Sequence, residues 1–235
     1  MTYSILAHDP ETRAFGTAVA SRFFAVGALC THAGGGVGAL STQALVNPMY
    51  GPDGMAMLRQ GTHADEVVNR LVGPDPGKAQ RQLHVMDRTG RTAQHTGTDC
   101  VGWAGHLQGV HISVAGNMLA GPDVLPAMLH SFATAHGSMA TRLLAALQAG
   151  ENAGGDKRGR QSAAVRVHTV DPYPDLDIRA DDHPDPLAEL RRLHAVSLER
   201  FAVFRRHLAG AASPWGELDR TVIDAAILRD GRPAA

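Results

Sequence analysis

The sequence has few of the features that mark proteins of membranes, nucleic acids or oxidising compartments. Two of its 235 residues are cysteines, Cys30 and Cys100, which excludes a disulfide-rich scaffold. No apolar run approaches the ~18 residues of a spanning helix, and the N-terminus has no basic region of a signal peptide. The formal net charge of −1 gives no basic excess for nucleic acid. We expect a cytoplasmic protein with no nucleic-acid or membrane partner.

Several common catalytic and cofactor motifs are missing as well. The glycines at 34–36 precede a strand-like run rather than a helix, which disfavours a nucleotide-binding loop. The sequence has no Gly-x-Ser-x-Gly elbow of an α/β-hydrolase. Its 13 histidines show no His-x-x-x-His pairing, and the cysteines have no partners at ligand spacing. We therefore expect no cofactor and no bound metal.

What the sequence does contain is enough apolar material for one large domain. It is 44% hydrophobic and 19% charged, which is typical of globular proteins. Folding a chain of this size removes roughly 70% of its surface from water. We expect a single domain over residues 1–210, followed by a C-terminal tail over residues 211–235 with a short helix.

The order of predicted elements favours α+β over alternating βαβ units. Strands are predicted at residues 3–8, 15–20, 26–31, 37–42, 81–88, 92–98, 110–115, 162–170 and 176–179. Helices are predicted at residues 54–59, 64–72, 123–135, 139–149, 187–208 and 218–228, and Thr62 is the expected N-cap of the second of these. Two hairpin-rich antiparallel sheets between helices fit this order. The exposed face of the 187–208 helix would suit a homodimer.

Thr2 is the sharpest chemical feature of the sequence. Methionine aminopeptidases remove the initiator before small residues, so the mature chain should begin with threonine. A threonine with a free α-amine combines nucleophile and base on one residue, because the amine pKa of roughly 7.7–8.0 lies near neutrality. The alternative is an ordinary first residue, since many proteins begin Met-Thr.

Two charged segments are further sites of interest. Arg22 follows an apolar strand and could bind an anionic group or lie at the rim of the core. The loop at 154–162 concentrates charges between glycines and runs into an apolar strand, which suits a binding loop as well as a solvated turn.

Taken together, these segments resemble the family catalogued as domain of unknown function 1028. The resemblance extends from Thr2 to about Leu193. It is carried by residues 2–5 (TYSI), 18–27 (AVASRFFAVG), 42–44 (TQA), 47–52 (NPMYGP), 103–106 (WAGH), 116–119 (GNML), 155–162 (GDKRGRQS) and 181–184 (DDHP).

The resemblance implies an N-terminal-nucleophile (Ntn) hydrolase fold, a four-layer αββα sandwich of two antiparallel sheets between helices. It implies an amidohydrolase or peptidase that acts on a small amide, with Thr2 as nucleophile after removal of Met1. The implied catalytic residues are Thr2, Ser21, Arg22, Thr42 and Gln43. The implied substrate-binding residues are Asn47, Asn117, Asp156, Lys157, Arg158, Arg160, Gln161 and Ser162. The lysine that often accompanies such a nucleophile has no counterpart at residues 20–45, where Arg22 would mainly tune charge.

Two alternatives remain open at this point. The first is a non-catalytic binding module that holds a small charged metabolite or a cell-wall fragment in the same cleft, as the charged loop suggests. The second is a metal-dependent hydrolase built on Asp181, Asp182 and His183.

Overall fold

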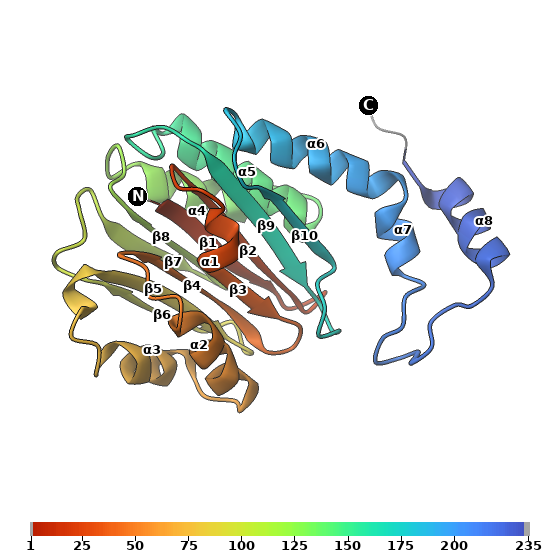
Figure 1. The fold of residues 1–235 in the computed structure, drawn as a ribbon, viewed down its shortest axis with the longest axis horizontal. Coiled ribbons are helices and arrows are strands. Elements are labelled where there is room, and N and C mark those ends of the chain that lie inside the picture. The colour runs from red at the N-terminus through yellow and green to blue at the C-terminus, as the bar shows by residue number, and fades with distance from the viewer. Residues whose placement is uncertain (1, 233–235) are drawn as a thin grey trace.

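The computed structural model describes residues 2–232 and contains two antiparallel sheets with helices on their outer faces (Figure 1). The six-stranded sheet has the order β10-β9-β2-β1-β8-β7, and the four-stranded sheet has the order β3-β4-β5-β6. The first sheet consists of β1 (Thr2–Asp9), β2 (Ala14–Ser21), β7 (Gly105–Gly109), β8 (Ile112–Asn117), β9 (Ser162–His168) and β10 (Leu176–Ala180). The second consists of β3 (Thr31–Gly34), β4 (Gly38–Ala44), β5 (Arg81–Asp87) and β6 (Thr92–Thr96). The expected α+β class with two antiparallel sheets is confirmed.

The helices divide between the two sheets. The helices α4 (Val124–Thr134), α5 (Met139–Asn152) and α6 (Pro186–Glu199) contact the six-stranded sheet. The helices α2 (Tyr50–Arg59) and α3 (Ala64–Val72) contact the four-stranded sheet. Each set of helices shares a hydrophobic cluster with its sheet, around Phe132 in the first case and around Leu40 in the second.

β1 is buried on both faces, because helices cover one face and the second sheet packs on the other. Tyr3 and Ile5 point toward α4 and α5, and Leu6 packs with Phe15 and Met86 between the sheets. This double burial explains why β1 reads as a continuous apolar and small-residue run rather than as a polar alternation.

Two element predictions are wrong and the edge strand β7 is missed, each for a local reason. Residues 26–31 are predicted as a strand, but Val26–Leu29 forms the short helix α1, which begins after Ala25 turns left-handed at φ 50°. The predicted 187–208 helix breaks at Arg200, whose φ of −138° separates α6 from α7 (Phe201–Arg205). Residues 105–109 are not predicted, because two glycines and a polar pair conceal the edge strand β7.

The remaining differences concern ends of elements. The helix expected at 54–59 begins at Tyr50, and His63 rather than Thr62 occupies the N-cap position of α3. A 3-10 turn at Lys78–Gln80 precedes β5. Among the described helices, none has the length and apolar character needed to cross a bilayer.

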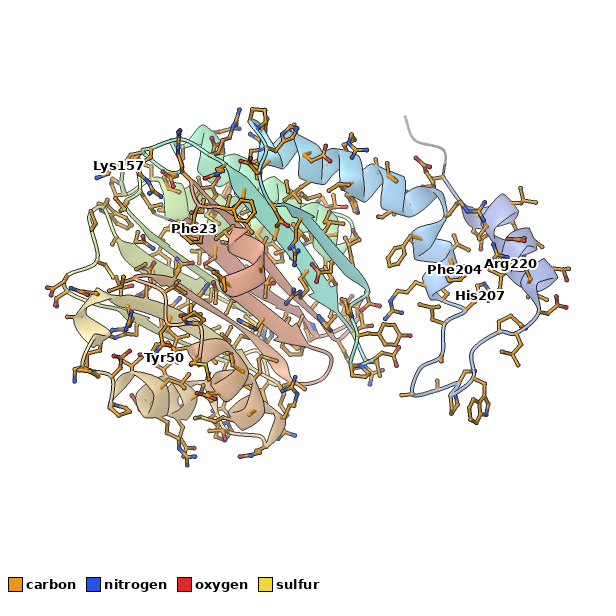
Figure 2. All side chains as sticks on the ribbon, in the orientation of Figure 1. Phe23, Tyr50, Lys157, Phe204, His207 and Arg220 are labelled. Carbon is orange, nitrogen blue, oxygen red and sulfur yellow. The ribbon has the colours of Figure 1, made fainter. Side chains whose placement is uncertain are left out.

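The C-terminal region forms an arm beside the main body (Figure 1). Helix α8 (Arg220–Asp230) lies in the predicted tail and packs on α7 through a cluster of Val203, Ile223, Ala226 and Ile227. Figure 2 shows Phe204, His207 and Arg220 in this arm, at the opposite end of the molecule from Lys157.

A chain of buried polar side chains joins the two sheets. The Ser4 hydroxyl donates to Gln43 Oε1 at 2.7 Å and lies 2.9 Å from His84 Nε2. Because that hydroxyl proton is committed to Gln43, Nε2 of His84 must be the protonated nitrogen. His84 Nδ1 then accepts from the Ser113 hydroxyl at 2.8 Å, and Gln94 donates to the same oxygen. Gln43 Nε2 in turn donates to Gln82 Oε1 at 2.8 Å. We call Ser4, Gln43, Gln82, His84 and Ser113 the inter-sheet network.

The inter-sheet network predicts an acid-sensitive fold. Burial, with a smaller contribution from His106, lowers the pKa of His84 to about 3, whereas an unfolded histidine titrates near ~6.5. Between these values only the unfolded chain takes up the proton, so His84 removes stability as the pH falls, by about 1.4 kcal/mol per pH unit. We expect His84→Gln to be less stable than the wild type at neutral pH and to lose less stability on acidification.

Urea unfolding of both proteins at several pH values between 7 and 4 measures this effect. Replacement of the exposed His136 by glutamine is the matched control and should retain the wild-type slope. A wild-type slope in His84→Gln would contradict this account of the network.

Candidate functional site

The candidate site lies where the N-terminal end of β1 meets three neighbouring strands. Thr2 pairs with Ser21 of β2 and with Asn117 of β8, and Ser21 pairs with Ser162 of β9. Residues directly opposite each other in antiparallel strands point to the same face. Asn117, Thr2, Ser21 and Ser162 therefore form one row across four strands, which we call the polar row.

The polar row is almost fully enclosed. Thr2 is 6% exposed, and the other three side chains are at most 2% exposed. The Thr2 and Ser21 hydroxyl oxygens lie 3.2 Å apart. Ser162 donates to the Phe23 carbonyl oxygen and accepts from the Val26 N–H, so it shapes the turn between β2 and α1. Met1, whose expected removal would expose the Thr2 amine, lies outside the described residues.

The charged loop is held against this row by Asp156. Its buried carboxylate accepts from the Arg22 N–H at 2.9 Å and from the Arg158 N–H at 2.8 Å. The Arg158 guanidinium pairs with the same carboxylate at 3.2 Å. These charge-assisted bonds fix the loop to the end of β2.

The other basic side chains of this segment are bonded to partners in the protein. The Arg22 guanidinium donates to the Arg158 carbonyl oxygen at 2.9 Å, and Lys157 donates to the Gly102 carbonyl oxygen at 3.1 Å. Arg160 pairs with Glu151 and with Asp185. Gln161 donates to Asp182 through its side-chain amide.

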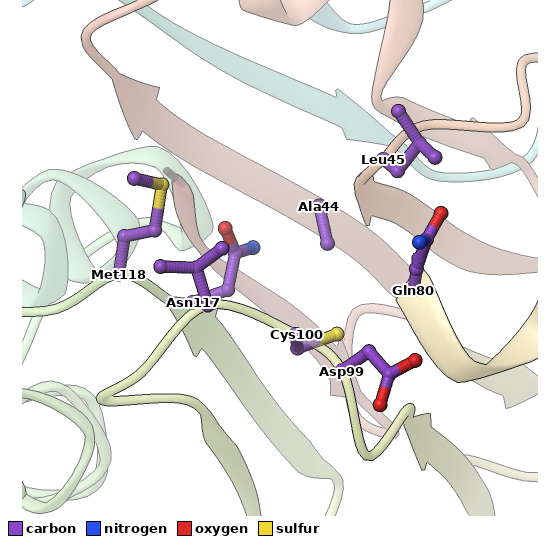
Figure 3. Close-up of a pocket in the computed structure, with 8 residues that line it drawn as sticks. Ala44, Leu45, Gln80, Asp99, Cys100, Asn117 and Met118 are labelled. Carbon is purple, nitrogen blue, oxygen red and sulfur yellow. The ribbon is translucent and has the colours of Figure 1, made fainter.

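A cavity of about 360 Å³ opens beside the polar row (Figure 3). Asn117 contributes to its wall, and the remaining lining residues are Ala44, Leu45, Gln80, Asp99, Cys100, Val101 and Met118. Ala44 and Met118 have φ of 70° and 52°, a left-handed conformation that is unusual for side chains larger than glycine. Such strain, of order 1–3 kcal/mol at each residue, is concentrated at functional sites in proteins.

Gln82 connects this cavity to the inter-sheet network. Its Oε1 accepts from Asn117 Nδ2 at 3.0 Å and from Gln43 Nε2 at 2.8 Å. Its Nε2 donates to the carbonyl oxygens of Gly105 and Gly116 and to Thr96 Oγ1. Gln82 thus fixes the orientation of the Asn117 amide. Gln82 is not predicted from the sequence, because the residues around it do not indicate which distant groups its side chain will bond.

The expected site residues fall into several groups, and Gln82 joins two of them because it accepts from both Gln43 and Asn117. The polar row and Asp156 gather at one end of the six-stranded sheet. Gln43 belongs to the inter-sheet network, and Thr42 is buried and donates to the Asn47 carbonyl oxygen at 3.1 Å. Asn47 lines a different cavity, of about 440 Å³, beside α2.

The segment of the metal alternative is engaged in local bonds. Asp181 pairs with Arg179 at 3.2 Å, Asp182 accepts from Gln161, and His183 Nδ1 accepts from the Asp185 N–H at 3.0 Å. Across residues 2–232, no three His, Cys, Asp or Glu side chains group as metal ligands. The geometry therefore gives the metal alternative no support.

Burial also shifts the acidity of two groups near the site. It raises the pKa of Tyr3 well above its ordinary value, with Glu151 adding to the shift, and the Tyr3 hydroxyl donates to Glu151 at 2.7 Å. Burial likewise raises the pKa of the Cys100 thiol in the cavity wall. Both groups are therefore neutral at physiological pH.

Among solved structures, the chain is similar to protein SPO2555 from Silicibacter pomeroyi, which is assigned to DUF1028. The two share 35% identity at a TM-score of 0.87, with 93% of this chain and 96% of that one covered. The chain also matches Anbu (ancestral beta-subunit) from Yersinia bercovieri at 12% identity and a TM-score of 0.40, covering 83% of this chain and 94% of that one. At that score the second likeness carries no argument.

No functionally curated protein matches the chain. The sequence profile of DUF1028, described as a family of unknown function, matches residues 2–190. With most of its length covered by that profile, the chain belongs to the DUF1028 family.

Proposed function

We propose that this protein is an N-terminal-nucleophile hydrolase of a small amide, with the four-layer αββα architecture of such enzymes. The observation that carries the proposal is the position of Thr2. It is the first described residue of β1, in register with Asn117, which lines the cavity. A mature chain beginning at Thr2 would therefore bring its hydroxyl and its α-amine to the edge of a ligand-sized space.

The chemistry follows from these two groups. The Thr2 Oγ attacks the amide carbonyl carbon while the α-amine takes the hydroxyl proton. When the tetrahedral intermediate collapses, the carbon–nitrogen bond breaks and the ammonium returns the proton to the leaving amine. Water, activated by the same α-amine, then hydrolyses the Thr2 ester. The acid is released and the hydroxyl is restored.

Asn117 would act on the substrate from the neighbouring strand β8. One of its amide hydrogens is directed to Gln82, which leaves the rest of the amide to meet the substrate oxygen or the leaving nitrogen. Asp156 would keep the charged loop in place, so its contribution is structural. The predicted homodimer and the cytoplasmic location are retained as parts of the proposal.

A β-lactone tests the nucleophile directly. Attack by Thr2 Oγ on the lactone carbonyl opens the ring, and the released alkoxide takes up a proton, so the adduct adds the whole reagent mass. We expect labelling of the wild type and of Thr2→Ser, and a loss of about a thousandfold or more in Thr2→Ala. The labelling rate is measured by intact mass spectrometry. Ser21→Ala is the neighbouring-hydroxyl control and should still be labelled.

Two outcomes would contradict the proposal. Equal labelling of Thr2→Ala and the wild type would place the nucleophile elsewhere. A protein that binds small amides equally well with and without the Thr2 hydroxyl, and that is neither labelled nor active, would be the binding module considered from the sequence.

Gln82 gives a second prediction, because it fixes the Asn117 amide. Gln82→Leu leaves the Asn117 and Gln43 amides without their acceptor, and misplacement of a positioning group by about 1 Å can cost about a hundredfold in rate. We expect the labelling rate of Gln82→Leu to fall about 10- to 100-fold. Gln94→Leu, at the far end of the network, is the matched control and should stay within about threefold. Urea unfolding verifies that both variants are folded, and equal rates in the two would contradict this role of Gln82.

A further inference from the structure

The cavity beside Asn117 has an uneven distribution of charge. Among its lining residues, all within the described part of the chain, the one carboxylate is Asp99 and none is a lysine or arginine. Asp99 is exposed at the rim, where its Oδ1 accepts a long bond of 3.3 Å from the Thr98 hydroxyl. The Cys100 thiol beside it is neutral. The fixed charge within the cavity is therefore negative.

Two basic side chains near this wall are bonded to other groups. Arg81 donates to the Leu45 carbonyl oxygen and pairs with Asp75 at 3.1 Å. Lys157 is held on the Gly102 carbonyl oxygen, outside the lining. The Asp75 carboxylate thus offsets the charge of Arg81, which contacts the backbone of the lining residue Leu45.

Apart from the amides of Gln80 and Asn117, the rest of the lining is apolar, and part of it is exposed to solvent. The side chains of Leu45 and Val101 are more than half exposed, at 57% and 55%. Met118 lies beside Asn117 in the close-up view (Figure 3). Exposed apolar side chains around a cavity mark a ligand surface rather than a core. The volume of about 360 Å³ lies at the small end of the range for ligand pockets, ~300–1,000 Å³.

We propose that this cavity selects small amides with a short apolar chain that ends in a cationic group, the ammonium or guanidinium lying at Asp99. The inference rests on the proposed function for the identity of the reacting group, which lies at the Asn117 end. The apolar chain then crosses Leu45, Val101 and Met118. An anionic terminus would meet like charge at Asp99 and is disfavoured.

Three amides of similar length test the selectivity: 6-aminohexanamide, heptanamide and adipic acid monoamide. Their binding is measured by calorimetry on the Thr2→Ala protein at low ionic strength, so that no turnover interferes. We expect the cationic amide to bind about threefold to fivefold more tightly than the neutral one, the scale of a single partly exposed ion pair. The anionic amide should bind most weakly, and added salt should reduce the differences.

Matched substitutions of two carboxylates test whether Asp99 causes the preference for the cationic amide. Asp99→Asn should abolish the preference for the cation. Asp53→Asn, which removes the same charge from the separate cavity beside α2, should retain it. Equal binding of the three amides, no binding of any, or an unchanged preference in Asp99→Asn would overturn the inference.

Failure of this inference differs from failure of the proposed function. Selective binding without turnover or labelling of the Thr2 protein would leave the charge selectivity standing and refute the hydrolase. Labelling at Thr2 without any charge preference would support the hydrolase and refute the charge selectivity.

Discussion

The structure depends on a set of hydrogen bonds buried between its two sheets. Ser4, Gln43, Gln82, His84 and Ser113 lie where two apolar sheet faces would otherwise meet, and all five are essentially inaccessible to solvent. An unpaired polar group there would cost about 1–3 kcal/mol. Each group in this chain donates to the next, in the order Gln94, Ser113, His84, Ser4 and Gln43. Each member therefore has a partner, and the bonds specify one register between the sheets.

The network reaches the candidate site through Gln82. That side chain accepts from Asn117, whose strand lies beside β1, so the position of the Asn117 amide depends on both sheets. At the same end of the sheet, the polar row continues from β1 to β2 and β9. There Asp156 fixes the charged loop to the end of β2. Thr2 is thus held by the fold rather than by its immediate neighbours in sequence, as the proposed chemistry would require.

The sequence predicts the helices and strands with strong local signals and fails where the signals are tertiary. The 64–72 helix has an apolar stripe and acidic residues in its first turn, and it is found with those bounds. The 26–31 strand fails because small apolar residues suit either element, and Ala25 redirects the chain. Of the site, the family motifs predict Thr2, Asn117 and the Asp156 loop. They do not predict the role of Gln82, and they do not predict that Asn47 lines a different cavity from Asn117. Both depend on contacts between residues that are distant in the sequence.

We propose that the mature chain begins at Thr2 and that this residue carries the nucleophile. Trypsin cleaves after Arg13 and Arg22, so Thr2 and Ser21 fall in different peptides. Tandem mass spectrometry of the tryptic digest after β-lactone treatment therefore tests the claim most directly. We expect a peptide of residues 2–13 that lacks Met1 and carries the adduct on Thr2. An adduct on the peptide of residues 14–22, or on a peptide that retains Met1, would contradict it.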